Sequence, residues 1–256
     1  MWKAVGTSVA GTSHVELNVP CQDYSAYERV MIGSVPAFII AIADGAGSAR
    51  LSHVGAQEAV GHLLRIIPLG LRSVVDVNEY VAREWLNDTR AHLQEVSSRE
   101  SCELRELGST ILVSILTDLA SFFIQIGDGA WIIERNGEYD VATWPSDGEY
   151  VNETTFLTSA NWADSIKYEV VAGALSAVAG LTDGLQRLAL QFDSRSVHTP
   201  FFDPLFQVLR AADDESSLIS PLKEFLSSDR VAERTDDDKT LVLACRTEQL
   251  FLPDAN

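Results

Sequence analysis

Short, almost continuously apolar segments recur along the chain, and several end where an aspartate precedes a glycine. The clearest is 37–43, which lies between Pro36 and the pair Asp44-Gly45. A run without polar positions and with turn residues at both ends predicts a strand that is buried on both faces. Similar runs predict further strands at 110–115, 121–126, 131–134, 168–171, 174–181 and 240–245, and a strand entering a loop at 5–17.

Between these strands, apolar residues recur at the three- and four-residue spacing of amphipathic helices. One helix is predicted at 52–67, with Ser52 as its N-cap and Pro68 at its end. A longer helix is predicted at 77–107, where it stops before Gly108. Shorter helices are predicted at 185–190, 204–212 and 217–227.

The order of these elements predicts the fold class. Strands follow one another through short turns such as Asn136-Gly137, a pair typical of tight β-hairpins, and the long helices come as a pair. This order favours an α+β fold of antiparallel sheets covered by helices over alternating βαβ units. With 256 residues, we expect a single domain spanning 1–256, with a polar, irregular flap insertion at about 139–163.

Charge and cysteine content narrow the classes of partner and compartment. The formal net charge is −18, and so acidic a surface repels nucleic-acid phosphates, which argues against DNA or RNA binding. Cys21, Cys102 and Cys245 form no C-x-x-C pair, so neither a disulfide framework nor a structural zinc site is expected. Without a signal-peptide pattern or an apolar run of bilayer length, we expect a cytoplasmic protein with no membrane partner.

The recurring aspartates are the candidate chemistry. Asp44, Asp128 and Asp183 each follow an apolar strand and precede a glycine, and the acidic run 236–238 precedes the last strand. Any one of them alone is typical of a turn. If the strand ends lie in one sheet layer, however, the carboxylates converge, and unpaired they repel one another and lose hydration. Divalent cations would remove that cost.

The ligand type narrows the choice of metal. All candidate ligands are oxygen atoms, which favour Mg²⁺ or Mn²⁺ over Zn²⁺. Two such ions would activate a bridging water and hold a phosphoryl oxygen. The five histidines are scattered, and the chain has no P-loop, G-x-S-x-G or H-E-x-x-H motif. The pattern therefore indicates a metal-dependent phosphatase.

Six short motifs follow one another along nearly the whole chain, from about residue 6 to residue 244. They are C-Q-D at 21–23, A-D-G-A-G-S at 43–48, G-S-T at 108–110, I-G-D-G at 126–129, L-T-D-G at 181–184 and D-D-K-T at 237–240. In this order they resemble the metal-dependent protein phosphatase 2C family (PPM-type), and most closely its bacterial branch with a D-G-A-G-S motif.

The resemblance implies a fold and a reaction. The fold would be a four-layer α-β-β-α sandwich, with two antiparallel sheets packed face to face between helix pairs and the metals at one edge. The reaction would be hydrolysis of phosphoserine or phosphothreonine by a metal-activated water, without a covalent intermediate. The partner would be a phosphorylated protein that an opposing serine/threonine kinase modifies.

The resemblance also implies site residues by motif. The cofactors would be two Mn²⁺ or Mg²⁺ ions, with a third, weaker site, and 148–154 would belong to the flap beside the cleft. The catalytic residues would be Asp44, Asp183 and Asp237. Within the metal site, Asp44 would bridge both ions and the Gly45 carbonyl would bind one of them. Asp183 and Asp237 would complete the site of the other ion. Asp23 would support the centre, and Asp128 would bind the third ion.

Three positions differ from many family members. His14 stands nearest the place of an arginine that grips phosphate, and when protonated it would take that phosphate-binding role. Gln22 replaces a glutamate, and Ala46 replaces a histidine that could act as a general acid, a role typically worth 10²–10⁴-fold in rate. Two alternatives stay open: a catalytically weak phosphoprotein-binding module, and a hydrolase of small phosphate esters.

Overall fold

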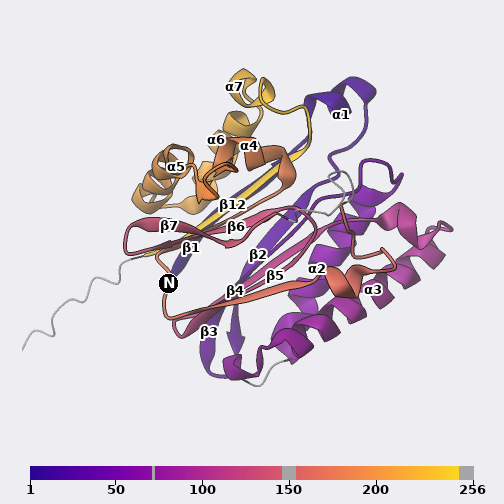
Figure 1. Cartoon of the computed structure of the whole chain (residues 1–256), viewed down its shortest axis with the longest axis horizontal. Helices are drawn as coiled ribbons and strands as arrows, with labels where there is room; N and C mark the ends of the chain where they lie inside the picture. Colours follow the sequence, from indigo (N-terminus) through magenta and orange to yellow (C-terminus); the bar gives the residue numbers. More distant parts are fainter. Residues whose placement is uncertain (71–72, 146–153, 248–256) are drawn as a thin grey trace, which may run out of the picture.

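Two five-stranded antiparallel sheets form the centre of the molecule (Figure 1). The computed structural model describes residues 1–70, 73–145 and 154–247. The first sheet has the order β1 (Trp2–Val9), β12 (Lys239–Arg246), β9 (Ala177–Leu181), β6 (Ala130–Arg135) and β7 (Glu138–Thr143). The second has the order β2 (Tyr24–Ile32), β3 (Val35–Ala43), β4 (Ile111–Leu116), β5 (Ala120–Ile126) and β8 (Lys167–Ala172).

The continuously apolar strands are buried on both faces, as β3 illustrates. Phe38, Ile40 and Ile42 belong to the apolar cluster between the two sheets. Ile39 and Ala41 point the other way and join the cluster beneath the helices. Because successive side chains of a strand alternate between faces, a strand in the middle of a layered fold needs apolar residues at every position.

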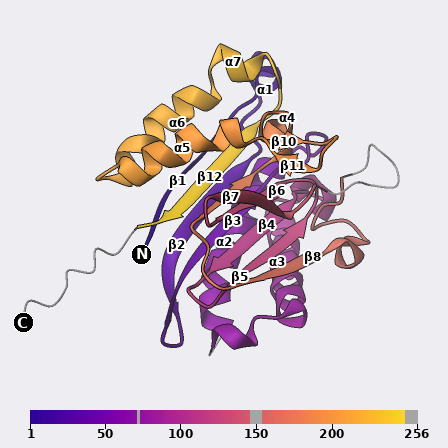
Figure 2. The ribbon, with the colours of Figure 1, turned by 60° about the vertical axis from the view of Figure 1, so that its left-hand side comes forward.

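Helices cover the outer face of each sheet (Figures 1 and 2). On the second sheet lie α2 (Ser52–Gly70) and α3 (Glu79–Arg99). On the first lie α4 (Gln186–Ala189), α5 (Thr199–Ala211), α6 (Ile219–Leu226) and α7 (Asp229–Ala232). The four-layer α-β-β-α sandwich is therefore confirmed. None of the described helices combines the length and apolar character that a bilayer crossing requires.

The remaining short elements are α1 (Thr12–Leu17), the small ribbon of β10 (Leu190–Gln191) and β11 (Ser196–Val197), and five 3₁₀ turns. The turns span Val74–Asp76, Leu104–Leu107, Trp162–Ser165, Asp183–Leu185 and Glu215–Leu218.

The two sheets approach closely at a glycine. A Cβ on Gly180 of β9 would lie 2.5 Å from Trp131 Cζ3 and 2.6 Å from Ile42 Cδ1. Trp131 is completely buried and its ring lies 5.7 Å from that of Phe123 on the opposite sheet. Glycine at this position therefore leaves room for the largest side chain of the inter-sheet layer.

Several predicted boundaries were wrong. β2 was not predicted, because this edge strand mixes polar and apolar residues and takes its register from pairing with β3. The helix predicted at 77–107 ends at Arg99, since Ser101 adopts a left-handed conformation with φ of 53°. Pro68 does not end α2 but lies inside its last turn. The first residues of the predicted flap, up to Thr143, belong to β7.

Other predictions hold closely. The Asn136-Gly137 pair joins β6 to β7, and both residues have positive φ, 55° and 81°. Left-handed values at both central residues are typical of the turn that matches strand twist in a two-residue hairpin.

Candidate metal centre

Three aspartates meet at one edge of the sandwich. Asp44 follows β3, Asp128 lies in the turn between β5 and β6, and Asp183 follows β9. One carboxylate oxygen from each lies within 4.8 Å of the others. β3 and β5 belong to one sheet, whereas β6 and β9 belong to the other. The aspartates thus converge as expected, but from both sheets and not from one layer.

Local sequence fixes the backbone beneath these carboxylates. The Asp44 N–H donates to Thr110 Oγ1 at 3.0 Å, and the Thr110 N–H donates to the Asp44 carbonyl at 2.8 Å. Gly127, just before Asp128, has φ of 100°, and a Cβ there would lie 2.5 Å from Thr110 Cγ2. Only glycine satisfies both the conformation and the contact. Thr110 therefore positions two of the three aspartates.

Asp23 lies behind the three aspartates and ties the two sheets together. Its Oδ2 accepts hydrogen bonds from the hydroxyls of Thr182 and Thr240, each at 2.8 Å. Its Oδ1 is buried and has no partner in the part of the chain that the structure describes. Burial raises the pKa of Asp23 to about 8, although the hydrogen bonds from Thr182 and Thr240 act in the opposite direction.

The electrostatics favour cation binding. Burial raises the pKa of Asp44 well above its usual range, and the charges of Asp23 and Asp183 add to the effect. Burial, then the charge of Asp128, raises the pKa of Asp183 to about 6. Several carboxylates this close are costly to ionise together without a cation. Half-buried carboxylate oxygens with raised pKa values suit a hard divalent ion.

The acidic run before β12 divides into two roles. Asp238 is buried, and its carboxylate accepts hydrogen bonds from the N–H groups of Gly11 and Gln22 at 2.7 and 2.5 Å. Asp237 is exposed and lies outside the group of three, although its charge contributes to the raised pKa of Asp183. His14 also lies outside the group, with Nδ1 2.9 Å from Asp238 Oδ1.

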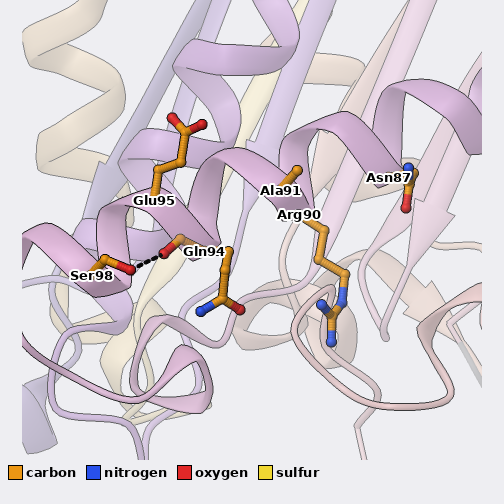
Figure 3. A pocket seen from close by; sticks show the side chains of 6 residues that line it. All are labelled: Asn87, Arg90, Ala91, Gln94, Glu95 and Ser98. Atoms are coloured by element: carbon orange, nitrogen blue, oxygen red, sulfur yellow. Dashed lines mark hydrogen bonds between the residues drawn. The ribbon is translucent and has the colours of Figure 1, made fainter.

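Two side chains that belong to none of the six sequence motifs also support the centre. Thr154 donates to Asp128 Oδ2 at 2.6 Å. Arg90 points from α3 into a pocket of about 390 Å³, and its Nη2 donates to the Thr158 carbonyl at 3.2 Å (Figure 3). Its Nε has no partner among the described residues. The sequence alone offers no signal for Arg90 beyond its place on an amphipathic helix.

Arg90 acts at a distance from the aspartates. Thr158 Oγ1 lies 3.4 Å from where a Cβ of Gly108 would be, and the Gly108 carbonyl accepts the Ala46 N–H at 2.9 Å. The hydrogen bond from Arg90 therefore holds the segment after residue 153 against the loop that follows Asp44. Residues 146–153 of the expected flap lie outside the described residues.

Comparison with known proteins decides the family. A sequence profile described as Protein phosphatase 2C matches residues 10–227. The chain belongs to the protein phosphatase 2C family. Serine/threonine-protein phosphatase 3 of Escherichia coli K12 is 34% identical over 251 residues, which cover 96% of this chain and 99% of that protein. The resemblance to the family is thereby confirmed, whereas the branch with a D-G-A-G-S motif stays a prediction, and the profile match stops before Asp237.

Solved structures agree on the fold. A bacterial serine phosphatase has a TM-score of 0.63 at 11% identity, covering 98% of this chain and all of that one. A Streptococcus agalactiae serine/threonine phosphatase has a TM-score of 0.61 at 15% identity, covering 96% and 99%. As a member of the protein phosphatase 2C family, the chain is a phosphoprotein phosphatase of a metal-dependent family, and its three clustered aspartates are able to hold a metal ion.

The raised pKa of Asp23 predicts an unusual pH dependence in metal-free protein. An unfolded aspartate titrates near 3.9, so with a native pKa of about 8 the folded state binds this proton more tightly. Its contribution to stability is complete below pH 4 and is lost as pH rises through about 8. Between pH 6 and 8, wild type should lose roughly 2 kcal/mol relative to Asp23→Asn.

Urea denaturation in chelator at each pH measures this difference. Asp164→Asn, at an exposed position, is the matched control and should follow the wild type. Parallel pH profiles for wild type and Asp23→Asn would contradict the assignment.

Proposed function

We propose that the chain hydrolyses phosphoserine and phosphothreonine in proteins with a binuclear Mn²⁺ or Mg²⁺ centre. One observation carries the proposal: carboxylates from both sheets converge within 4.8 Å where burial opposes their charge. The name of the 34% identical relative, a serine/threonine-protein phosphatase, supports the substrate class. An opposing serine/threonine kinase would supply the phosphorylated protein.

The residues present suit such a centre. Asp44 would bridge the ions and the Gly45 carbonyl would bind one, while Asp183 and Asp237 would hold the other, with a third, weaker site at Asp128. When bound, the ions would supply an activated water as nucleophile and a clamp for a phosphoryl oxygen. The unpartnered Asp23 Oδ1 would accept a hydrogen bond from a water of the centre. The catalytic residues are thus Asp44, Asp183 and Asp237.

Thr110 and Arg90 have positioning roles in this proposal. Thr110 holds the Asp44 backbone through two hydrogen bonds, so that the carboxylate needs little reorganisation on ligand binding. Arg90 holds the segment beyond residue 153 beside the centre. Residues 1–256 would form a single domain in which the flap insertion contributes to the substrate cleft, and the bond between Thr154 and Asp128 supports that placement.

Replacing Asp44 tests the metal centre. Asp44→Asn keeps the size but removes the charge that would bridge two cations. Turnover should vanish, and metal affinity should fall by more than the 10–100-fold typical of an outer partner. In metal-free protein, the variant should be as stable as wild type or more stable, because fewer carboxylates repel. With Mn²⁺, wild type should gain more in Tm, since a ligand of the native state stabilises it.

Tm against Mn²⁺ concentration for wild type, Asp44→Asn and Asp183→Asn is the decisive measurement, with Asp164→Asn as an exposed control. Equal responses in all four proteins would show that these aspartates are turn residues. Activity should require Mn²⁺ or Mg²⁺ and disappear in EDTA. Full activity in chelator would contradict the two-metal proposal.

Substrate comparison separates the remaining alternatives. A phosphothreonine peptide should be hydrolysed with higher kcat/KM than p-nitrophenyl phosphate. The reverse order would indicate a hydrolase of small phosphate esters. Phosphopeptide binding without turnover, in protein loaded with Mn²⁺, would indicate a binding module.

His14 is the proposed phosphate-binding residue. It lies in α1 and pairs with the buried Asp238, which directly follows the exposed Asp237 in the chain. An arginine there would carry a permanent charge and a forked set of donors. His14→Arg should therefore lower KM for a phosphopeptide above pH 7 by roughly threefold to tenfold, with kcat little changed. An unchanged KM, with wild-type Tm and Mn²⁺ affinity, would show that His14 is a structural partner of Asp238 only.

A further inference from the structure

The helix layer over the first sheet contains an apolar groove. α5 and α6 lie on β1 and β12, and between them is a cavity of about 720 Å³. Val5 and Leu243 of the sheet form its floor. Leu205 of α5 and Leu222 of α6 form its walls. The groove therefore reaches the sheet from the outer surface of the molecule, on the layer drawn in orange and yellow in Figure 2.

The opposite helix layer shows how the fold closes such a space. There α2 and α3 meet directly: the rings of His62 and His92 stack at 4.3 Å, and Arg99 pairs with Glu58 at 2.6 Å. Between α5 and α6, the Phe201–Phe225 ring contact at 6.0 Å joins the two helices. Along the groove, apolar side chains stay accessible, and Val208 is 54% exposed. Accessible apolar side chains inside a cavity offer a candidate binding surface for an apolar group.

The groove also has basic residues in its lining. Arg187 of α4, Arg230 of α7 and Arg234 line the groove and are exposed. Within the described part of the chain, none of the three forms an ion pair or a side-chain hydrogen bond. Glu233 is the acidic residue among the lining side chains. On a chain of net charge −18, three unpaired arginines at one apolar opening form a local site of attraction for anions.

The size of the groove selects the shape of its occupant. The cavity volume of about 720 Å³ lies within the range of about 300–1,000 Å³ that small-molecule sites span. A slender acyl chain or a pair of fused aromatic rings fits between the helices, and its charged end reaches the arginines.

We propose that the groove between α5 and α6 binds a small amphipathic anion, with its apolar body against Val5, Leu222 and Leu243 and its anionic group at Arg187, Arg230 and Arg234. This site is separate from the proposed metal centre and does not depend on the proposed phosphatase reaction. Free acyl carboxylates and aromatic sulfonates share the required chemistry.

Calorimetric titration of the full chain tests the site. Decanoate should bind with a Kd on the order of 10–100 µM below its micellar concentration, and 8-anilinonaphthalene-1-sulfonate should compete with it. Decanol and decyltrimethylammonium, which keep the apolar chain and change the head group, should bind at least about tenfold more weakly. Equal binding of decanoate and decanol would overturn the proposal, as would no decanoate binding.

Variants locate the binding. Arg187→Ser/Arg230→Ser/Arg234→Ser should weaken decanoate binding at least about tenfold and leave decanol unaffected, while Arg99→Ser on the opposite helix layer should change neither. Val208→Trp, at an accessible position, should fill the groove and reduce binding of both. Tm and hydrolysis of p-nitrophenyl phosphate report the fold. Unaltered decanoate binding in both groove variants would overturn the proposal. So would strong binding that occurs only after residues 248–256 are removed.

Discussion

The crowding of half-buried carboxylates at one edge of the sandwich is the constraint on which the rest of the structure depends. Asp44, Asp128 and Asp183 come from strands of two different sheets, so their geometry exists only when both sheets are correctly stacked. Their mutual repulsion and lost hydration oppose folding in the absence of a cation. The apolar layers must therefore hold the strand ends in place against this repulsion, and the raised pKa of Asp44 reports the same opposition.

Apolar packing holds the strand ends in place in the interior of the sandwich, and hydrogen bonding holds them near its edge. Strands such as β3 are apolar on both faces, so one strand contributes to the layer between the sheets and to the layer under the helices. Nearer the edge, hydroxyl groups replace apolar contacts. Thr182 and Thr240, from neighbouring strands of one sheet, both donate to Asp23 at the start of the other. The sandwich is thus joined across its edge by polar contacts that also define the centre.

The sequence alone predicted those parts of the fold whose signal is local. The apolar run of β3 ends at Asp44, and the Asn136-Gly137 hairpin has its own turn residues, so both were correctly placed. β2 has no comparable signal, because pairing with β3 defines it. That the aspartates converge could be inferred from repeated motifs, but their origin in two sheets could not, because strand order within a sheet depends on long-range pairing. Arg90 was missed because its hydrogen-bond partner, the Thr158 carbonyl, lies 68 residues away in the chain.

The run Asp236–Asp237–Asp238 shows what hydrogen bonding adds to a motif. In the sequence the three carboxylates are equivalent, yet Asp238 is buried and accepts two backbone N–H groups and pairs with His14. A Cβ at Gly11 would lie 2.2 Å from the Asp236 carbonyl, so the chain passes too closely for any other residue. Asp238 therefore joins β12 to the segments that precede α1 and β2, whereas Asp237 is exposed and its Oδ1 accepts the N–H of Asp238 at 2.8 Å.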